Sequence, residues 1–247
     1  MCAARMVRRP RRPARAPFPL LGKRQARREA ARGAQLLRRG ELAAALKALT
    51  AAVEMDPRDP STWNGRGVVL ETLGRTEEAL RCANRAIKLA PGYLEAWCNK
   101  GVALMHLGRA DRALECFDAV LKVDDRHALA LMNRGVLLSR QGRHEEALEW
   151  LDKAIEADPE YALAVVNRAS TLFALGRFSK AIDAYNLALR RRPDLPDAWF
   201  FKGRALLEEG QGEAAEVCFE KALELRPDFP EVAPYLEKAR GKGGGDG

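Results

Sequence analysis

The chain has 247 residues, of which 47% are hydrophobic, so it can bury the core of one or two ordinary domains. No apolar run approaches the roughly 18–20 residues that a membrane-spanning helix needs, which argues against a transmembrane protein. The formal net charge of +8 comes from residues 1–25, which hold eight Arg and Lys residues and no acid. Basic and acidic residues balance in the remainder, which excludes a basic nucleic-acid-binding body.

Residues 1–25 form the first predicted segment, a Pro- and Arg-rich tail. Its high charge and low content of large apolar residues predict disorder. Two interpretations stay open. The tail binds RNA or an anionic membrane surface, or it is a start-site artefact and the native protein begins downstream, for example at Met6.

From residue 26 onward, the sequence repeats with a period of 34 residues. One glycine series keeps this interval throughout: Gly40, Gly74, Gly108, Gly142, Gly176 and Gly210. An alanine series keeps it too: Ala45, Ala79, Ala113, Ala147, Ala181 and Ala215. The predicted repeats are 26–59, 60–93, 94–127, 128–161, 162–195 and 196–229. A residue's place is its position within its own repeat. Periods of this length are typical of helical arrays in which each hairpin packs on its neighbours.

Each repeat is predicted to fold as helix, turn, helix. In the second repeat, Trp63, Gly67 and Leu70 follow the i, i+4, i+7 spacing of one helix face. Gly74 then ends the first helix, since glycine adopts a left-handed cap at no steric cost. Pro91 closes the repeat because proline cannot continue a helix interior. Small residues at fixed places indicate close packing of the two helices.

The last repeat is followed by a predicted capping helix at 230–240 and a flexible Gly-rich end at 241–247. A polar-faced terminal helix is what a repeat array needs to cover its last apolar face. The expected fold class is therefore all-α, with about six helical hairpins and a C-terminal capping helix.

These features resemble the tetratricopeptide repeat family, whose 34-residue pattern places Trp, Gly, Ala, Phe or Tyr, and Pro at fixed positions. The matching residues include Trp63, Trp97, Trp199, Phe117, Tyr185 and Phe219, and the match covers residues 26–229. The resemblance implies a right-handed α-solenoid whose first helices line a concave groove that binds proteins or peptides. The chain departs from the pattern at place 7, where Arg or Lys replaces Leu in every repeat. We interpret this as a tolerated surface variant rather than a phosphate-binding ladder.

A mainly apolar stripe on the first helices provides the candidate peptide-binding residues. Its members are Met105, Met132, Val136, Val166, Phe173 and Phe200. Two interpretations stay open: an exposed strip that marks a partner site, or a strip that neighbouring hairpins bury.

Three asparagines at place 6 complete the candidate groove: Asn99, Asn133 and Asn167. A side-chain amide is both donor and acceptor, so a ladder of amides can pair with an extended backbone. The asparagine-lined groove of O-linked N-acetylglucosamine transferase is similar. The alternative is that these amides bond within the repeats. The carboxylate clamp of chaperone-tail cochaperones is not expected, because place 5 never holds Lys.

No catalytic or metal-binding constellation is found, so we expect no enzyme activity, no cofactor and no metal. The three histidines lack ligand-like spacing, and no nucleophile elbow or phosphate loop is present. The five cysteines form no C-x-x-C pair, which favours a reducing, cytoplasmic compartment. Those at place 23, such as Cys82, are expected to be small packing residues.

The predicted function is a non-catalytic scaffold or adaptor that holds a protein or peptide in its groove. Two alternatives remain: a targeting or anchoring module that uses the basic tail, and a scaffold that assembles with itself. The sequence does not identify the partner, the pathway, the affinity or the oligomeric state.

Overall fold

In the computed structural model, the described residues 19–241 form thirteen α-helices and no strand, which confirms the all-α prediction. The predicted disordered tail lies outside these residues over 1–18, as does the flexible end over 242–247. The tail boundary at residue 25 was placed too late, because helix α1 begins at Pro19. Proline suits the first turn of a helix, where its missing N–H would have no partner. The Ala, Arg, Gln and Glu residues that follow are good helix formers.

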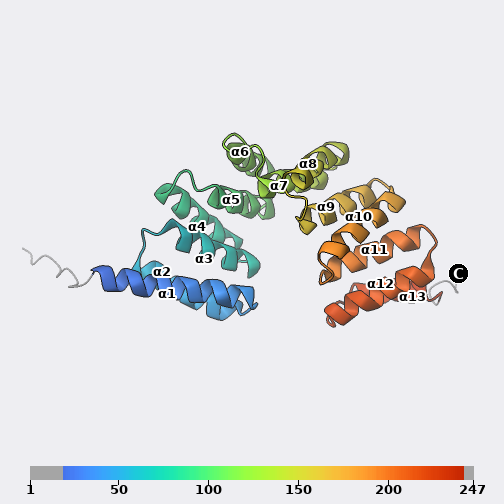
Figure 1. The fold of residues 1–247 in the computed structure, drawn as a ribbon, viewed down its shortest axis with the longest axis horizontal. Coiled ribbons are helices and arrows are strands. Elements are labelled where there is room, and N and C mark those ends of the chain that lie inside the picture. Colours follow the sequence, from blue (N-terminus) through green and yellow to red (C-terminus); the bar gives the residue numbers. More distant parts are fainter. Residues whose placement is uncertain (1–18, 242–247) are drawn as a thin grey trace, which may run out of the picture. The chain divides into compact units, whose positions relative to one another are not determined.

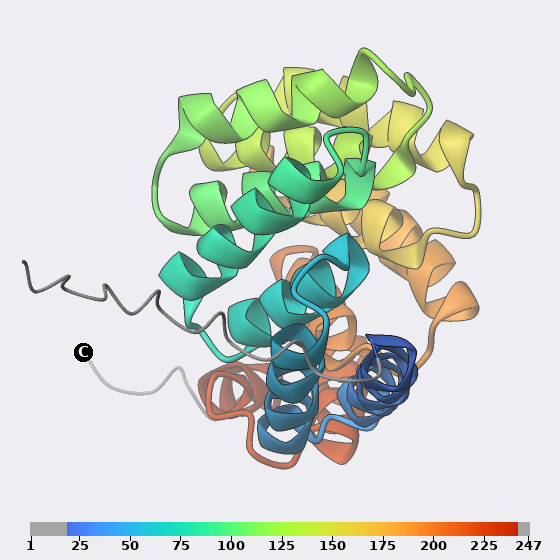
Figure 2. The same cartoon turned by 90° about the vertical axis from the view of Figure 1, so that its left-hand side faces the viewer.

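The chain divides into two compact units, residues 1–91 and residues 92–247. The N-terminal unit holds two helical hairpins, shown in blue and cyan in Figure 1 and from the side in Figure 2. Their helices are α1 (Pro19–Arg38) with α2 (Leu42–Met55), and α3 (Pro60–Thr72) with α4 (Thr76–Leu89).

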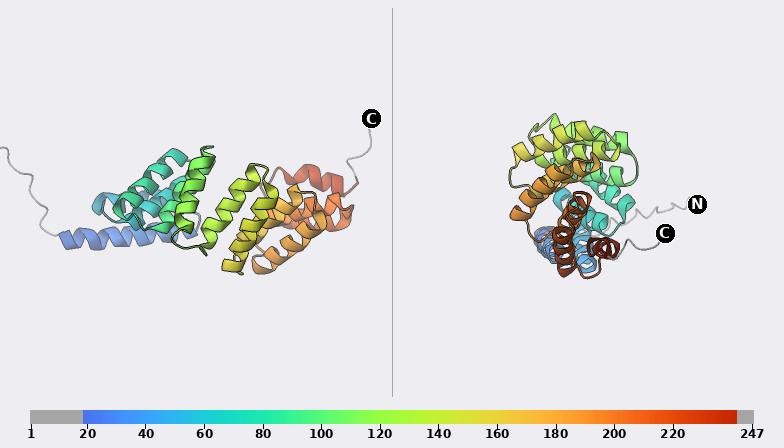
Figure 3. Two further views of the ribbon diagram at one scale, coloured as in Figure 1. Left: turned by 90° about the horizontal axis from the view of Figure 1, so that it is seen from above. Right: turned by 90° about the vertical axis from the view of Figure 1, so that its right-hand side faces the viewer.

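The C-terminal unit holds four hairpins and a terminal helix, and Figure 3 shows its hairpins side by side. Its hairpins are α5 (Leu94–His106) with α6 (Ala110–Leu121), α7 (Ala128–Arg140) with α8 (His144–Ala157), α9 (Ala162–Ala174) with α10 (Phe178–Arg191), and α11 (Pro196–Glu208) with α12 (Gly212–Leu225). Helix α13 (Val232–Ala239) packs on α12 and α11.

Each hairpin turns at the glycine that the sequence periodicity marked. At the α7–α8 turn, Gly142 has φ of 78°, a left-handed conformation that costs glycine nothing. Its N–H donates to the Ser139 carbonyl, and the Arg143 N–H donates to the Leu138 carbonyl. These two bonds form a Schellman cap, which satisfies carbonyls that the helix end leaves free.

Small residues let the two helices of a hairpin approach closely, and large residues fill the space opposite. A Cβ atom at Gly203 would lie 2.6 Å from the Phe219 ring, and one at Gly101 would lie 2.5 Å from the Phe117 ring. Both rings are fully buried. Burying such a ring contributes about 2–3 kcal/mol, so these two hairpins each have an apolar centre between their helices.

In the C-terminal unit, the first helices converge and the second helices diverge. Helix α5 contacts α7, α7 contacts α9, and α9 contacts α11. Among the described residues of this unit, no comparable contacts link α6 with α8 or α8 with α10. The first helices therefore form the inner face of the unit, and clefts open between the second helices on its outer face.

Two of the basic residues at place 7 form ion pairs between neighbouring hairpins. Arg134 Nε donates to Asp118 Oδ1 at 2.8 Å, and Arg168 Nε donates to Asp152 Oδ1 at 2.6 Å. Each pair joins the first helix of one hairpin to the second helix of the preceding hairpin. These cations therefore have a structural role in addition to being tolerated at the surface.

Candidate functional site

The most distinctive charged group on the inner face is Arg204 of α11. Its guanidinium carbon lies 5.0 Å from the ring centre of Phe173, 5.5 Å from Phe201, 4.9 Å from Tyr235 and 5.9 Å from Phe200. These rings come from α9, α11 and α13, so three helices contribute to one cluster. A cation beside aromatic faces is attracted by their quadrupoles. We call these five residues the Arg204 cluster.

Within the described residues, no carboxylate pairs with Arg204, in contrast to most arginines of the C-terminal unit. Arg134, Arg168, Arg177 and Arg226, for example, each form an ion pair at 2.6–2.8 Å. Arg204 is half-buried, and its N–H groups make no hydrogen bond within that part of the chain. Because a guanidinium carries five donors and no acceptor, it can bind a carboxylate from another molecule.

A hydroxyl pair lies close to this cation. Ser170 Oγ and Tyr185 Oη are 2.9 Å apart, and Tyr185 is fully buried. Burial raises the pKa of Tyr185 to about 12, although the Ser170 hydrogen bond and the charge of Arg204 act in the opposite direction. Tyr185 is therefore neutral at physiological pH and holds Ser170 at the edge of the inner face.

The structure divides the predicted apolar strip into core and surface. Met105, Met132 and Phe200 are buried, with 9%, 7% and 5% of their surface exposed. Val136, Val166 and Phe173 are half-buried. Each of the two open interpretations thus fits part of the strip, because three members are buried in the core and three keep exposed surface. The half-buried residues remain available to a partner.

The three place-6 asparagines have different surroundings. Asn167 Nδ2 donates to the Leu163 carbonyl of its own helix at 2.8 Å, which fits the structural interpretation. Asn133 is 6% exposed, and its Nδ2 has no hydrogen-bond partner among the described residues. Asn99 is half-buried and interacts with other residues. The three amides therefore do not form a uniform ladder.

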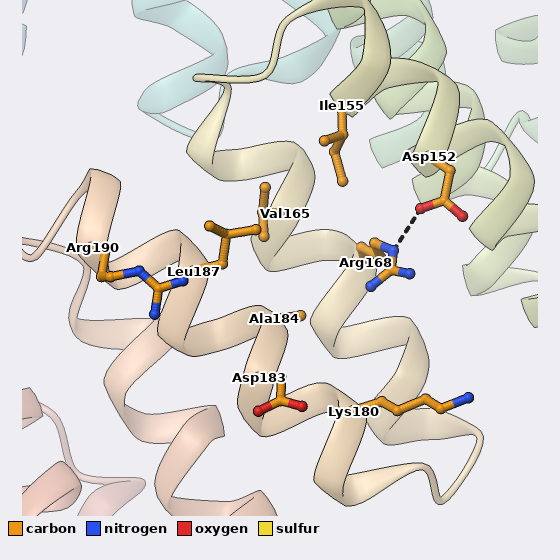
Figure 4. A pocket seen from close by; sticks show the side chains of 9 residues that line it. All are labelled: Asp152, Ile155, Val165, Arg168, Lys180, Asp183, Ala184, Leu187 and Arg190. Atoms are coloured by element: carbon orange, nitrogen blue, oxygen red, sulfur yellow. Dashed lines mark hydrogen bonds and ion pairs between the residues drawn. The ribbon is translucent and has the colours of Figure 1, made fainter.

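A separate hollow lies on the outer face, between α8 and α10, with a volume of about 520 Å³. Figure 4 shows Arg168 bonded to Asp152 on one side of it and the side chains of Val165 and Leu187 close together. Lys180, Asp183 and Arg190 add charge around these apolar side chains.

The cysteines at place 23 are packing residues, as expected. Cys82, Cys116 and Cys218 are free and 1–3% exposed. Burial raises the pKa of each thiol, which suppresses the reactive thiolate. The described residues contain no group of three or more His, Cys, Asp or Glu side chains placed to hold a metal ion.

A tetratricopeptide repeat model matches residues 31–93, 72–115, 98–162 and 166–230. The chain belongs to the tetratricopeptide repeat family. Proteins with this fold act as scaffolds for protein interactions, and members are typically non-catalytic. No curated protein matches the chain. None of the helices between residues 19 and 241 is long and apolar enough to cross a membrane.

Solved structures share this tetratricopeptide fold. The Cut9–Hcn1 hetero-tetramer of APC/C matches with a TM-score of 0.79 and 19% identity, over 87% of this chain and 43% of that chain. A tetratricopeptide repeat protein of Parabacteroides merdae matches with a TM-score of 0.74 and 21% identity, over 87% and 84%. A thermophilic tetratricopeptide repeat protein of Thermus thermophilus matches with a TM-score of 0.65 and 27% identity, over 73% and 98%. The chain thus spans less than half the length of the Cut9–Hcn1 chain.

The Arg204 cluster was not identified from the tetratricopeptide pattern. Arg204 stands at place 9 of its repeat, where the preceding repeats have the small residues Val102, Val136 and Ser170. The signal that could have identified the cluster is an arginine at a place where the three preceding repeats have uncharged residues, four residues after Phe200.

Proposed function

We propose that the protein binds an acidic polypeptide segment on the inner face of its C-terminal unit, with Arg204 holding a carboxylate. The observation that carries this proposal is the Arg204 cluster: a cation with no carboxylate partner among the described residues, set between rings of three helices. The rings fix the orientation of the guanidinium without neutralising it. An anionic partner supplies the missing charge, and its charge-assisted hydrogen bonds are stronger than neutral ones.

Apolar contacts beside the cation would add affinity to this charge contact. Val136, Val166 and Phe173 are half-buried, so each retains surface that a bound segment can cover. Asn133 contributes a donor that lacks a partner among the described residues, and leaving such a buried donor unpaired costs about 1–3 kcal/mol. Its Nδ2 is buried from solvent, so a backbone carbonyl of the bound segment would pair with it only after neighbouring side chains move aside. These residues form the proposed peptide site, together with Asn99, Asn167 and the buried supports Met105, Met132 and Phe200. YrrB, a neighbour with a TM-score of 0.51 and 20% identity, is described as having an unusual peptide-binding site.

The test uses partners captured from the source cell, whose bound segment is then made as a peptide and titrated by calorimetry. Arg204→Met should weaken binding by about 10- to 100-fold, since a hydrogen bond to a charged group contributes ~1.5–3 kcal/mol. Methionine fills the aromatic cluster and keeps the fold. Arg204→Lys should give an intermediate loss, because lysine keeps the charge but not the bidentate geometry.

The matched control is Arg112→Met, which removes an exposed arginine from the second helix α6. Its affinity should equal that of the unmodified protein. Raising the salt concentration should lower the peptide affinity of the unmodified protein more than that of Arg204→Met, because salt screens the charge pair. Equal affinity of Arg204→Met and the unmodified protein, with both folded, would refute the proposal.

A further inference from the structure

Tryptophan side chains occupy the outer clefts on both sides of the hollow between α8 and α10. In the preceding cleft, between α6 and α8, Trp150 of α8 stacks on Arg134. The guanidinium carbon of Arg134 lies 3.8 Å from the ring centre, and Lys153 Nζ lies 4.4 Å from the same centre. In the following cleft, Trp199 of α11 donates its indole N–H to the Pro193 carbonyl at 2.9 Å.

The fifth repeat has neither tryptophan. Its place 23, where the fourth repeat has Trp150, is Ala184, and its place 4, where the sixth repeat has Trp199, is Val165. Both small residues line the hollow of about 520 Å³. The cleft is therefore open because the fifth repeat lacks the indole that fills the equivalent cleft of the fourth repeat.

The ion pair that lies beneath the Trp150 indole has an equivalent in the fifth repeat. Arg168 bonds Asp152 at 2.6 Å, as Arg134 bonds Asp118 at 2.8 Å beneath Trp150. Both arginines stand at place 7, and both aspartates stand at place 25 of the preceding repeat. An aromatic ring placed above Ala184 would meet Arg168 as Trp150 meets Arg134.

We infer that this hollow receives a tryptophan side chain from a partner polypeptide. Val165, Ile155 and Leu187 supply apolar contacts for the ring, and Arg168 supplies a cation beside its face. The Asp183 carboxylate lines the same hollow and can accept the indole N–H, a donor that a phenylalanine ring lacks. This outer site is distinct from the Arg204 cluster and does not depend on the proposed function.

The residues of the sequence that lie outside the described part do not supply the occupant. Residues 1–18 and 242–247 contain no tryptophan. The four tryptophans of the chain are half-buried within helices α3, α5, α8 and α11, so a second copy offers none as a free anchor.

The test uses N-acetyl-L-tryptophanamide as the probe and follows the methyl resonances of Ile155, Val165 and Leu187 in protein with labelled methyl groups. We expect saturable shifts confined to these methyls, and no comparable shifts with N-acetyl-L-alaninamide. Ala184→Trp reproduces place 23 of the fourth repeat and should abolish the saturable shifts. Ala184→Leu fills less of the hollow and should weaken probe binding at least severalfold; it serves as the second variant should Ala184→Trp fail to fold.

The matched variant is Trp150→Ala, which opens the cleft between α6 and α8. It should add a second probe site, reported by the methyls of Leu121 and Leu131, while the first site is unchanged. Arg204→Met should leave probe binding at the hollow unchanged, which separates this inference from the proposed function. Saturable shifts that persist in a folded Ala184→Trp protein would overturn the inference, as would an unchanged probe affinity in folded Ala184→Leu or a probe that does not shift the three methyls.

Discussion

At the residue scale, the buried ionisable side chains of the C-terminal unit are kept neutral. Burial raises the pKa of the Cys98 thiol to about 12 from an ordinary value of 9.0, with a smaller contribution from Glu95. The pKa of Tyr185 is raised to about 12 from 10.0, again mainly by burial. Both groups therefore bind their protons more tightly in the folded protein than in the unfolded chain.

This difference predicts a loss of stability in alkali. Between about pH 9 and 12 the unfolded chain loses these protons while the folded protein keeps them, so the free energy of unfolding falls as pH rises. The slope is about 1.4 kcal/mol per pH unit for each group. Urea unfolding between pH 8 and 11 measures it. Cys98→Ala should flatten the profile from pH 9 upward. A profile without slope in the unmodified protein would contradict the assignment.

At the element scale, the distance between the two helices of a hairpin is set by one small residue on the first helix. Gly203 faces the Phe219 ring, which is fully buried and also lies 6.0 Å from Phe200 and 6.1 Å from Tyr235 between ring centres. The ring cannot move aside without disturbing the Arg204 cluster. The fold of this hairpin and the proposed site are therefore linked through Phe219.

We predict that Gly203→Ala destabilises the protein by about 1–3 kcal/mol, the usual cost of forcing an extra methyl group into a packed core. Gly65→Ala is the matched control, because a Cβ atom at Gly65 would meet only Leu49, at an ordinary 3.5 Å. Alanine is the better helix former, so that control should be more stable by about 0.5–1 kcal/mol. Thermal unfolding followed by circular dichroism compares the two variants, and a stabilised Gly203→Ala would disprove the packing argument.

At the scale of the whole molecule, hairpins contact mainly their sequence neighbours. In the C-terminal unit, α6 packs on α7, α8 on α9 and α10 on α11, and ion pairs such as Arg168–Asp152 repeat from one hairpin to the next. Such an array has stability that is approximately the sum of its hairpins and their interfaces. A complete repeat can therefore be removed without destroying the others.

Deleting residues 128–161 removes the fourth repeat and joins place 34 of the third repeat directly to place 1 of the fifth. We expect the product to stay helical and to unfold cooperatively, with a lower melting temperature. Deleting only residues 128–144 removes α7, the turn after it and the first residue of α8, which leaves the rest of α8 without the helix that covers it. That variant should lose helix content per residue in circular dichroism. Equal damage in the two deletions would show that the 34-residue unit is not the folding unit.

Much of the fold follows from local chemistry and was predictable from the sequence. Glycine at the end of each first helix, small residues at the helix contacts and proline at the end of most repeats each act through a few neighbouring residues. The positive-φ glycines Gly74 and Gly142 accordingly follow helices α3 and α7. The start of α1 at Pro19 was missed because charge and composition were taken as evidence of disorder over residues that form a helix.

The sequence by itself determined the repeat, its length and the places of its core residues, because these depend on spacing along one chain. Tertiary structure decided which side chains of the inner face are covered, since that depends on how closely first helices of different hairpins approach. It therefore placed Met132 in the core and left Phe173 half-buried. It also brought Tyr235 to Arg204, and opened a cleft beside Ala184 that no single repeat contains.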